Sequence, residues 1–160
     1  MKKKVLVVDD DLQIRDSLRK VLQAEDYEVV LAADGQEAID KCNSERIDLL
    51  LLDLNLPASS GWDTFETITS LNPLLPIIII TGRPNQHELA TWAGVGALME
   101  KPLDVPKLLR IIAELTAEPA ETRLKRLVGL HGDTRYVPRY SPLRSTRSPK
   151  NEGTTDENRF

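Results

Sequence analysis

Five short apolar runs, separated by segments with helical periodicity, constrain the fold of this chain more than any other feature. The runs do not alternate with polar residues, which is typical of parallel strands that are covered on both faces. They occupy residues 5–8, 29–31, 49–52, 77–80 and 97–99. After each run, apolar residues recur three and four positions apart, as on one face of a helix. Five strands alternating with five helices predict an α/β fold with a parallel sheet between two helical layers, because right-handed crossovers leave few other arrangements.

The two parts of the 160-residue chain differ in composition. Residues 1–118 hold 12 basic and 20 acidic side chains, whereas residues 119–160 hold 9 basic and 5 acidic ones, so the net charge of −4 is the sum of −8 and +4. The second part is rich in proline, serine, threonine and arginine and poor in apolar residues, so little burial can offset the entropy lost on ordering. We therefore expect one domain at 1–118 and a largely disordered basic tail at 119–160.

Cysteine count and hydropathy exclude several classes of protein. The single cysteine, Cys42, cannot form an internal disulfide, and no residues have the spacing of zinc ligands. The apolar run that follows the N-terminal lysines ends after four residues at Asp9, which is too short for the core of a signal peptide. No run approaches the roughly 18 residues of a membrane span. A cytoplasmic location without membrane contact is the expectation.

Polar side chains follow four of the five apolar runs. Because the carboxyl ends of parallel strands meet at one edge of a sheet, these side chains should lie close together. They are Asp9, Asp10 and Asp11 after the first run, Asp53 after the third, Thr81 with Gly82 after the fourth, and Lys101 with Pro102 shortly after the fifth. Asp11 is expected to be the N-cap of the first helix rather than part of the site.

Clustered carboxylates repel one another, which favours a bound hard cation or a raised pKa. Oxygen ligands dominate at this edge, so Mg²⁺ is the natural cation, and it would share its remaining coordination positions with phosphate oxygens. The edge therefore predicts a site for a phosphoryl group.

Residues 1–118 resemble the receiver domain of bacterial two-component response regulators. The resemblance rests on four motifs in the order and spacing of that family, which are residues 7–11, residues 51–57 with Gly61 beyond, Thr81-Gly82 and Lys101-Pro102. It implies a flavodoxin-like (βα)5 fold, a three-layer sandwich whose parallel strands have the order 2-1-3-4-5.

The resemblance also assigns roles to individual residues. Asp53 would be the nucleophile that accepts the phosphoryl group. Mg²⁺, or Mn²⁺ in its place, would be held by Asp10, Asp53 and the main-chain carbonyl of Asn55, with Asp9 acting through a metal-bound water. Lys101 would neutralise phosphoryl oxygens, and the hydroxyl of Thr81 would donate to the phosphoryl group once it is attached.

Further positions are implied as modulators of the site. Asn55, Gly82 and Arg83 border the phosphoryl group in the family and would influence its lifetime. Pro102 would follow a cis peptide bond, which would fix the direction in which the side chain of Lys101 points. The family commonly has an aromatic switch residue three positions before the lysine, and this chain has Leu98 there. The coupling between Thr81 and the output face is therefore expected to differ.

The implied function is a response regulator that takes a phosphoryl group from a sensor histidine kinase or a phosphotransfer protein. It would catalyse its own aspartyl phosphorylation and dephosphorylation rather than turn over a free substrate. The signal would pass to a downstream protein, or to a second copy in a homodimer, through the face built from helix four, strand five and helix five.

Three alternatives compete with this interpretation. One is a nucleic-acid-binding regulator that uses the basic tail. Another is a pseudo-receiver, an interaction module that is never phosphorylated. A third is a phosphatase of the haloacid dehalogenase type, which would need a second aspartate two residues after Asp53, where Asn55 stands.

Overall fold

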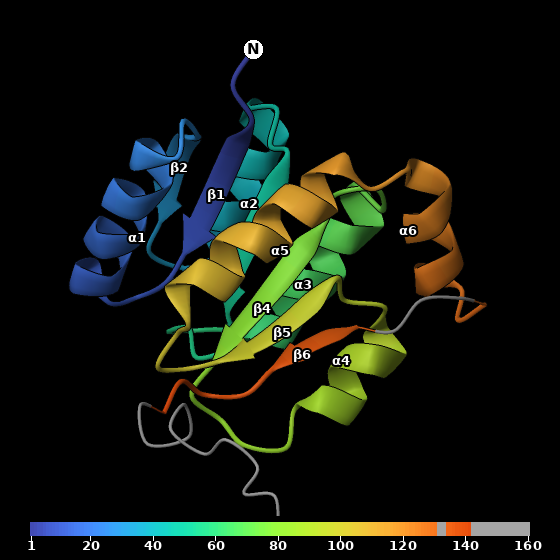
Figure 1. Ribbon diagram of the computed structural model, residues 1–160. Coiled ribbons are helices and arrows are strands. Elements are labelled where there is room, and N and C mark those ends of the chain that lie inside the picture. Colours follow the sequence, from blue (N-terminus) through green and yellow to red (C-terminus); the bar gives the residue numbers. More distant parts are fainter. Residues whose placement is uncertain (131–133, 142–160) are drawn as a thin grey trace, which may run out of the picture.

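The computed structural model describes residues 1–130 and 134–141, and a parallel sheet lies at its centre (Figure 1). The strands have the order β2-β1-β3-β4-β5-β6, and each neighbouring pair is parallel. Their bounds are β1 (Lys4–Val8), β2 (Glu28–Ala32), β3 (Leu49–Asp53), β4 (Ile77–Thr81), β5 (Ala97–Glu100) and β6 (Arg135–Val137). The first five strands confirm the flavodoxin-like order, and β6 extends the sheet beyond β5.

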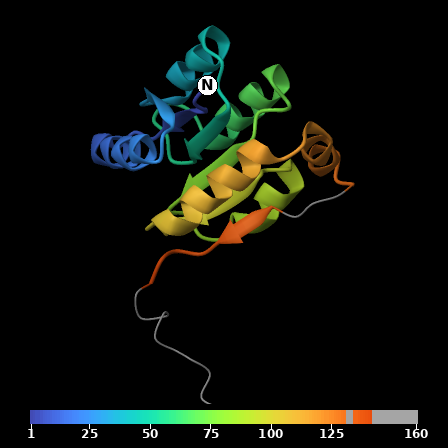
Figure 2. The same cartoon turned by 45° about the horizontal axis from the view of Figure 1, so that its top comes forward.

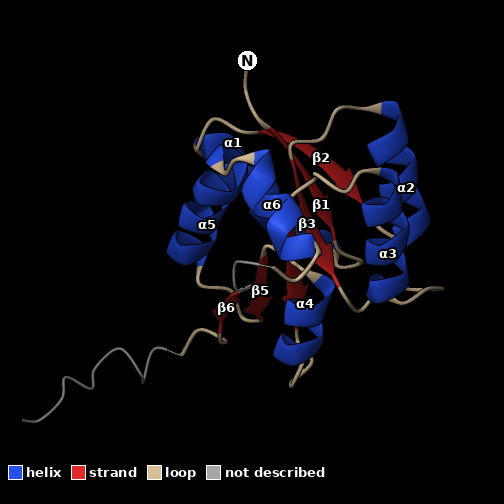
Figure 3. Ribbon diagram, turned by 90° about the vertical axis from the view of Figure 1, so that its right-hand side faces the viewer, coloured by secondary structure: helices blue, strands red, loops and turns tan. Residues whose placement is uncertain are grey.

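Helices cover both faces of the sheet, as the view along its plane shows (Figure 3). Helices α1 and α5 lie on one face, and α2, α3 and α4 lie on the other. The helices are α1 (Leu12–Ala24), α2 (Gly35–Ser44), α3 (Gly61–Leu71), α4 (His87–Ala93), α5 (Val105–Ala117) and α6 (Ala120–Leu127).

Each face of the sheet has its own apolar core. Alternate residues of one strand point to opposite faces, so Leu50 and Leu52 of β3 pack toward α2 and α3, whereas Leu49 and Leu51 pack toward α1 and α5. Every residue of β3 and β4 is buried. The unalternating apolar runs thus reflect strands that are covered on both sides.

Short polar side chains fix where several helices begin. The carboxylate of Asp11 accepts hydrogen bonds from the N–H groups of Gln13 and Ile14, which confirms it as the N-cap of α1. Asp34, Ser60 and Asp104 cap α2, α3 and α5 in the same way. These caps satisfy N–H groups that the first turn of a helix leaves without partners, and they fix the loops that follow the strands.

Two elements, α6 and β6, lie beyond Glu118, where we expected a largely disordered tail. That expectation does not hold for them, because each is anchored to the domain. Arg123 donates to the main-chain oxygens of Leu74, Leu115 and Glu118, and Arg126 pairs with the carboxylate of Glu118. Val137 of β6 is only 8 % exposed and joins the core beneath α5. The other residues of the expected tail, 131–133 and 142–160, lie outside the described part of the chain.

The helices of residues 1–130 are all too short or too polar to cross a membrane, and the described residues contain no candidate span.

Candidate functional site at the carboxyl edge of the sheet

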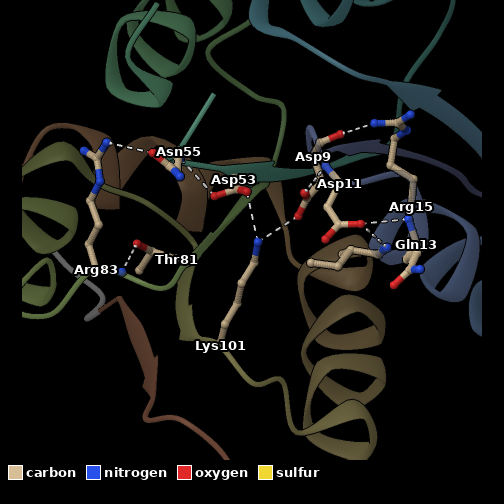
Figure 4. A network of polar contacts seen from close by, with 10 residues as sticks. Asp9, Asp11, Gln13, Arg15, Asp53, Asn55, Thr81, Arg83 and Lys101 are labelled. Carbon is tan, nitrogen blue, oxygen red and sulfur yellow. Dashed lines mark hydrogen bonds and ion pairs between the residues drawn. The ribbon is translucent and has the colours of Figure 1, made fainter. Parts of the chain in front are cut away.

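The four polar motifs converge at one end of the sheet, where β1, β3, β4 and β5 finish (Figure 4). Strand β3 lies between β1 and β4, so the residue that ends it, Asp53, stands beside the residues that end its neighbours. An open cleft at this edge is lined by Asp9, Asp10, Asp11, Ile14, Asp53, Asn55, Gly82, Arg83 and Lys101. The strand ends thus bring together residues that are up to 92 positions apart in the sequence.

The ammonium group of Lys101 is shared by two carboxylates. Its Nζ lies 2.9 Å from Oδ2 of Asp9 and 2.9 Å from Oδ2 of Asp53. Burial opposes the charged form of this side chain, but the hydrogen bonds to both carboxylates outweigh burial, and the pKa of Lys101 is raised above its ordinary value. The lysine is therefore a fixed positive charge over the whole neutral range.

Asp53 is almost fully enclosed, with 2 % of its surface exposed. Its Oδ1 accepts a hydrogen bond from the N–H of Asn55 at 2.9 Å, so both oxygens have a donor. Burial raises the pKa of Asp53, and the neighbouring carboxylate of Asp9 raises it further, whereas the Asn55 N–H and Lys101 act in the opposite direction. The carboxylate is poorly solvated but aimed into an open cleft, which suits a nucleophile.

Carboxylate oxygens of Asp9, Asp10 and Asp53 lie within 4.8 Å of one another. Asp9 and Asp53 are buried and Asp10 is exposed, and Oδ1 of Asp9 accepts from the N–H of Asp11 at 2.9 Å. Three convergent carboxylates with one side open to water are a donor set of the kind that Mg²⁺ takes, because this ion keeps several waters and accepts few protein ligands. The residues present therefore fit the cation.

Thr81 ends β4 and has no exposed surface. Its Oγ1 accepts a hydrogen bond from the N–H of Arg83 at 2.9 Å, and its main-chain oxygen accepts from the N–H of Lys101 at 2.8 Å. The guanidinium of Arg83 donates to Oδ1 of Asn55 at 3.3 Å. A Cβ built on Gly82 would meet no atom within 4 Å, so the cleft is open beside this residue.

The Lys101–Pro102 peptide bond is cis. Leu98, at the position where the family commonly has its aromatic switch, is fully buried in the core on the α2–α3 side and pairs in register with Tyr136 of β6.

Contacts that no sequence motif indicated surround these residues. Arg15, on the first turn of α1, donates to the main-chain oxygen of Asp9 at 2.6 Å and so supports the loop that carries the acidic residues. Glu100 precedes Lys101 and interacts with Tyr136 and Arg139. The contacts of Glu100 leave no local signal in the sequence, because they join residues whose proximity arises only in the folded chain. Spacing could at best have suggested Arg15, one helical turn after Asp11.

Comparison with known proteins decides the family. The response regulator receiver domain matches residues 5–113, which is more than half of the chain. The chain belongs to the response regulator receiver domain family. This receiver is 38 % identical over 111 residues to the response regulator MprA of Mycobacterium bovis, an alignment that covers 68 % of the chain and 48 % of the relative. The chain thus spans about half the length of the curated relatives it matches.

Solved structures resemble this receiver over their whole length. A CheY-like response regulator receiver domain from Methanospirillum hungatei has a TM-score of 0.70 at 32 % identity, covering 78 % of this chain and 98 % of that one. The response regulator TrrA of Thermotoga maritima, solved in complex with Mg²⁺ and BeF, has a TM-score of 0.66 at 32 % identity, covering 71 % of this chain and 98 % of that one. The chemotaxis response regulator CheY4 of Vibrio cholerae is similar at 30 % identity with a TM-score of 0.66, covering 72 % and 99 %.

Proposed function

We propose that this receiver accepts a phosphoryl group on Asp53 in a reaction that requires Mg²⁺. The observation that carries the proposal is the convergence of Asp9, Asp10, Asp53 and Lys101 within one cleft. These four side chains would have two different roles in the reaction. The acidic cluster suits a divalent cation, and the ammonium of Lys101 suits an anion that is attached to the carboxylate beside it.

In the proposed reaction an oxygen of the Asp53 carboxylate attacks phosphorus in line. A phosphohistidine of a sensor kinase or phosphotransfer protein is the natural donor, and its N–P bond breaks as the O–P bond forms. Mg²⁺, held by Asp10, Asp53 and the Asn55 carbonyl with Asp9 acting through water, would neutralise charge on the transferred group. Lys101 would stabilise the same charge, and the hydroxyl of Thr81, which is buried in the unmodified site, would turn toward the attached phosphoryl group and donate to it. Mn²⁺ would be accepted by the same donors.

Further positions modulate this reaction in the proposal. Arg83 and Asn55, which hydrogen-bond to each other across the mouth of the cleft, limit the approach of water to the phosphoryl group. Gly82 leaves room for the donor. Thr81 and Leu98 would be the switch residues that connect the phosphorylation site to strand β5. The cis bond before Pro102 would orient the side chain of Lys101.

The proposed output surface is the face formed by α4, β5 and α5, which a protein partner or a second copy would bind. We place the protein in the cytoplasm, where histidine kinases present their phosphoryl groups. Nucleic-acid binding through the described part of the C-terminal region is less well supported, because its arginines all engage carbonyl or carboxylate oxygens of the protein itself; they are Arg123, Arg126, Arg135 and Arg139.

Intact mass spectrometry tests the proposal. The chain is incubated with acetyl phosphate, with and without Mg²⁺, and Asp53→Asn serves as the inactive variant. Asp48→Asn is the matched control, since Asp48 immediately precedes β3 at the opposite end of the strand. We expect a Mg²⁺-dependent phosphoryl adduct on the natural chain and on Asp48→Asn, and none on Asp53→Asn. An adduct that persists in Asp53→Asn would reject the site, and a chain that forms no adduct would favour the pseudo-receiver.

A further inference from the structure

Strand β6 covers the edge of β5, in the middle of the face that we propose as the output surface. It runs parallel to β5 and pairs Ala97 with Arg135, Leu98 with Tyr136, and Met99 with Val137. Figure 2 shows β6 at the margin of the sheet, outside β5 and between α4 and α5. The main-chain edge of β5 is therefore occupied by the chain's own C-terminal region.

Residues 134–140, which we call the C-terminal segment, contact all three elements of that face. On the α4 side, the ring of Tyr136 lies 4.7 Å from the ring of His87, and the buried hydroxyl of Thr134 donates to the main-chain oxygen of Val95 at 2.6 Å. On the α5 side, Nε of Arg135 lies 3.1 Å from a carboxylate oxygen of Glu114. Val137, 8 % exposed, fills the core beneath α5. The segment thus has the backbone pairing, the apolar anchor and the charge pairs of a bound peptide that adds a strand to a sheet.

The same segment holds both neighbours of Lys101. Glu100 accepts a hydrogen bond from the hydroxyl of Tyr136 and pairs with the guanidinium of Arg139 at 3.7 Å. The main-chain oxygen of Pro102 accepts from the N–H of Tyr140 at 2.9 Å. The backbone on each side of the lysine that contacts Asp53 is therefore attached to the C-terminal segment.

From these contacts we infer that the C-terminal segment is an intramolecular ligand of the output face, bound when Asp53 is unmodified and released when Asp53 is phosphorylated. The inference rests on the proposed function. With the segment bound, Lys101 contacts the carboxylates of Asp9 and Asp53 directly. A phosphoryl group on Asp53 places its oxygens beyond that carboxylate, so the ammonium of Lys101 shifts to reach them, and in the proposed mechanism the neighbouring residues Glu100 and Pro102 move with it.

Movement of Glu100 and Pro102 weakens their contacts with Tyr136, Arg139 and Tyr140, so modification and release are linked. Linkage is reciprocal, and any change that releases the segment must favour phosphorylation by the same factor. The segment then occupies the site of the downstream protein in the resting state and leaves it in the phosphorylated state. The same face is the proposed homodimer surface, so the segment also covers that surface until Asp53 is phosphorylated.

Hydrogen exchange on the full chain is the direct test. The amides of Arg135 and Tyr140, which donate to the main-chain oxygens of Gly96 and Pro102, report whether the segment is bound. Acetyl phosphate with Mg²⁺ should accelerate exchange across residues 135–140 by about tenfold, a coupling of ordinary size, and leave β1 and β3 unchanged. Asp53→Asn should show no acceleration. Intact mass on the same samples measures the phosphoryl adduct.

A pair of valine variants tests the reciprocal effect. Val137→Asp places a charge at the buried anchor and should release the segment, whereas Val128→Asp makes the same change at a valine that is 65 % exposed. At equilibrium with a fixed ratio of acetyl phosphate to acetate, Val137→Asp should show a several-fold higher ratio of phosphorylated to unphosphorylated protein than the natural chain, and Val128→Asp should show the same ratio as the natural chain. If Val137→Asp does not fold, Arg135→Glu replaces it. Adding Glu114→Arg to Arg135→Glu restores a pair of opposite charges, so the double variant should be phosphorylated to the same extent as the natural chain.

The outcomes separate the two claims. Unchanged exchange at residues 135–140 in a sample whose mass shows the adduct overturns the inference and leaves the phosphoacceptor function standing. Equal ratios of phosphorylated to unphosphorylated protein in Val137→Asp and Val128→Asp overturn it as well. A natural chain that forms no adduct overturns both.

Discussion

Lys101 bridges Asp9 and Asp53, with its Nζ 2.9 Å from one oxygen of each carboxylate. The two carboxylates are 2 % exposed and would repel each other if the ammonium were absent. One side chain therefore stabilises the unmodified site and supplies the positive charge that the transferred phosphoryl group needs.

Replacing this lysine should expose the repulsion between the two carboxylates. We expect Lys101→Met to lower the free energy of unfolding by about 1–3 kcal/mol in the absence of Mg²⁺, because two buried anions lose their partner. Urea denaturation measures the loss. Lys107→Met is the control, since Lys107 is 49 % exposed and its pairing with Asp104 is loose at 3.8 Å. It should change stability by less than about 0.5 kcal/mol. Equal effects of the two substitutions would contradict the bridging role.

Gly61 is expected to tolerate no side chain, because α3 begins against the loop that follows Asp53. A Cβ at this position would lie 2.7 Å from the main-chain oxygen of Asp53 and 2.8 Å from that of Leu54. Since these atoms belong to the backbone, the loop itself must shift. Gly61→Ala should cost about 2 kcal/mol or more in thermal or urea unfolding. Gly82→Ala, on the other side of the cleft where no atom lies within 4 Å, should be nearly neutral, and a comparable loss there would refute the steric account.

The buried pair between Arg126 and Glu118 should make α6 part of the cooperative fold. Their side chains are 5 % and 7 % exposed, so Arg126→Met leaves a buried carboxylate without its main partner and should cost about 3 kcal/mol. Lys125→Met, one residue earlier on the same helix, removes a lysine that is 48 % exposed and pairs with Glu121, and it should cost less than about 0.5 kcal/mol. If both variants unfold at the urea concentration of the natural chain, α6 does not contribute to stability.

Cys42 should react slowly with alkylating agents at neutral pH. Burial raises the pKa of its thiol to about 11, and only the thiolate is reactive, so at pH 8 roughly 0.1 % of the thiol is ionised. The rate of iodoacetamide alkylation in the folded chain should therefore rise about tenfold per pH unit from pH 7 to pH 10. In urea-unfolded protein it should level off above pH 9. A half-maximal rate near pH 8.5 in the folded protein would show that partial burial does not raise the pKa of the thiol.

The candidate site could be predicted from the sequence because Asp9, Asp10, Asp53, Thr81 and Lys101 each follow an apolar run within two residues. Once the runs at 49–52 and 77–80 are taken as adjacent parallel strands, Asp53 and Thr81 must emerge at the same edge of the sheet. The strand order 2-1-3-4-5 came from the family resemblance, since the alternation of runs and helical segments fits several orders. The structure confirms that order for the first five strands.

The elements beyond Glu118 could not be predicted for a physical reason. Helix α6 is anchored by Arg123 and Arg126, whose partners include the main-chain oxygen of Leu74, 49 residues away. Strand β6 has three residues and a single buried anchor, Val137. The three residues of β6 are too few to carry a periodic signal, and the order of both elements depends on contacts with a surface that exists only after the rest of the chain has folded.

The position of the phosphoryl group is the most direct test of the whole account. The chain is treated with acetyl phosphate and Mg²⁺, the acyl phosphate is reduced with borohydride to convert the modified aspartate to homoserine, and the digest is sequenced by tandem mass spectrometry. We predict homoserine at position 53 alone. Homoserine at Asp9 or Asp10, or its absence from all three positions in a sample whose intact mass carries the adduct, would contradict the assignment of the nucleophile.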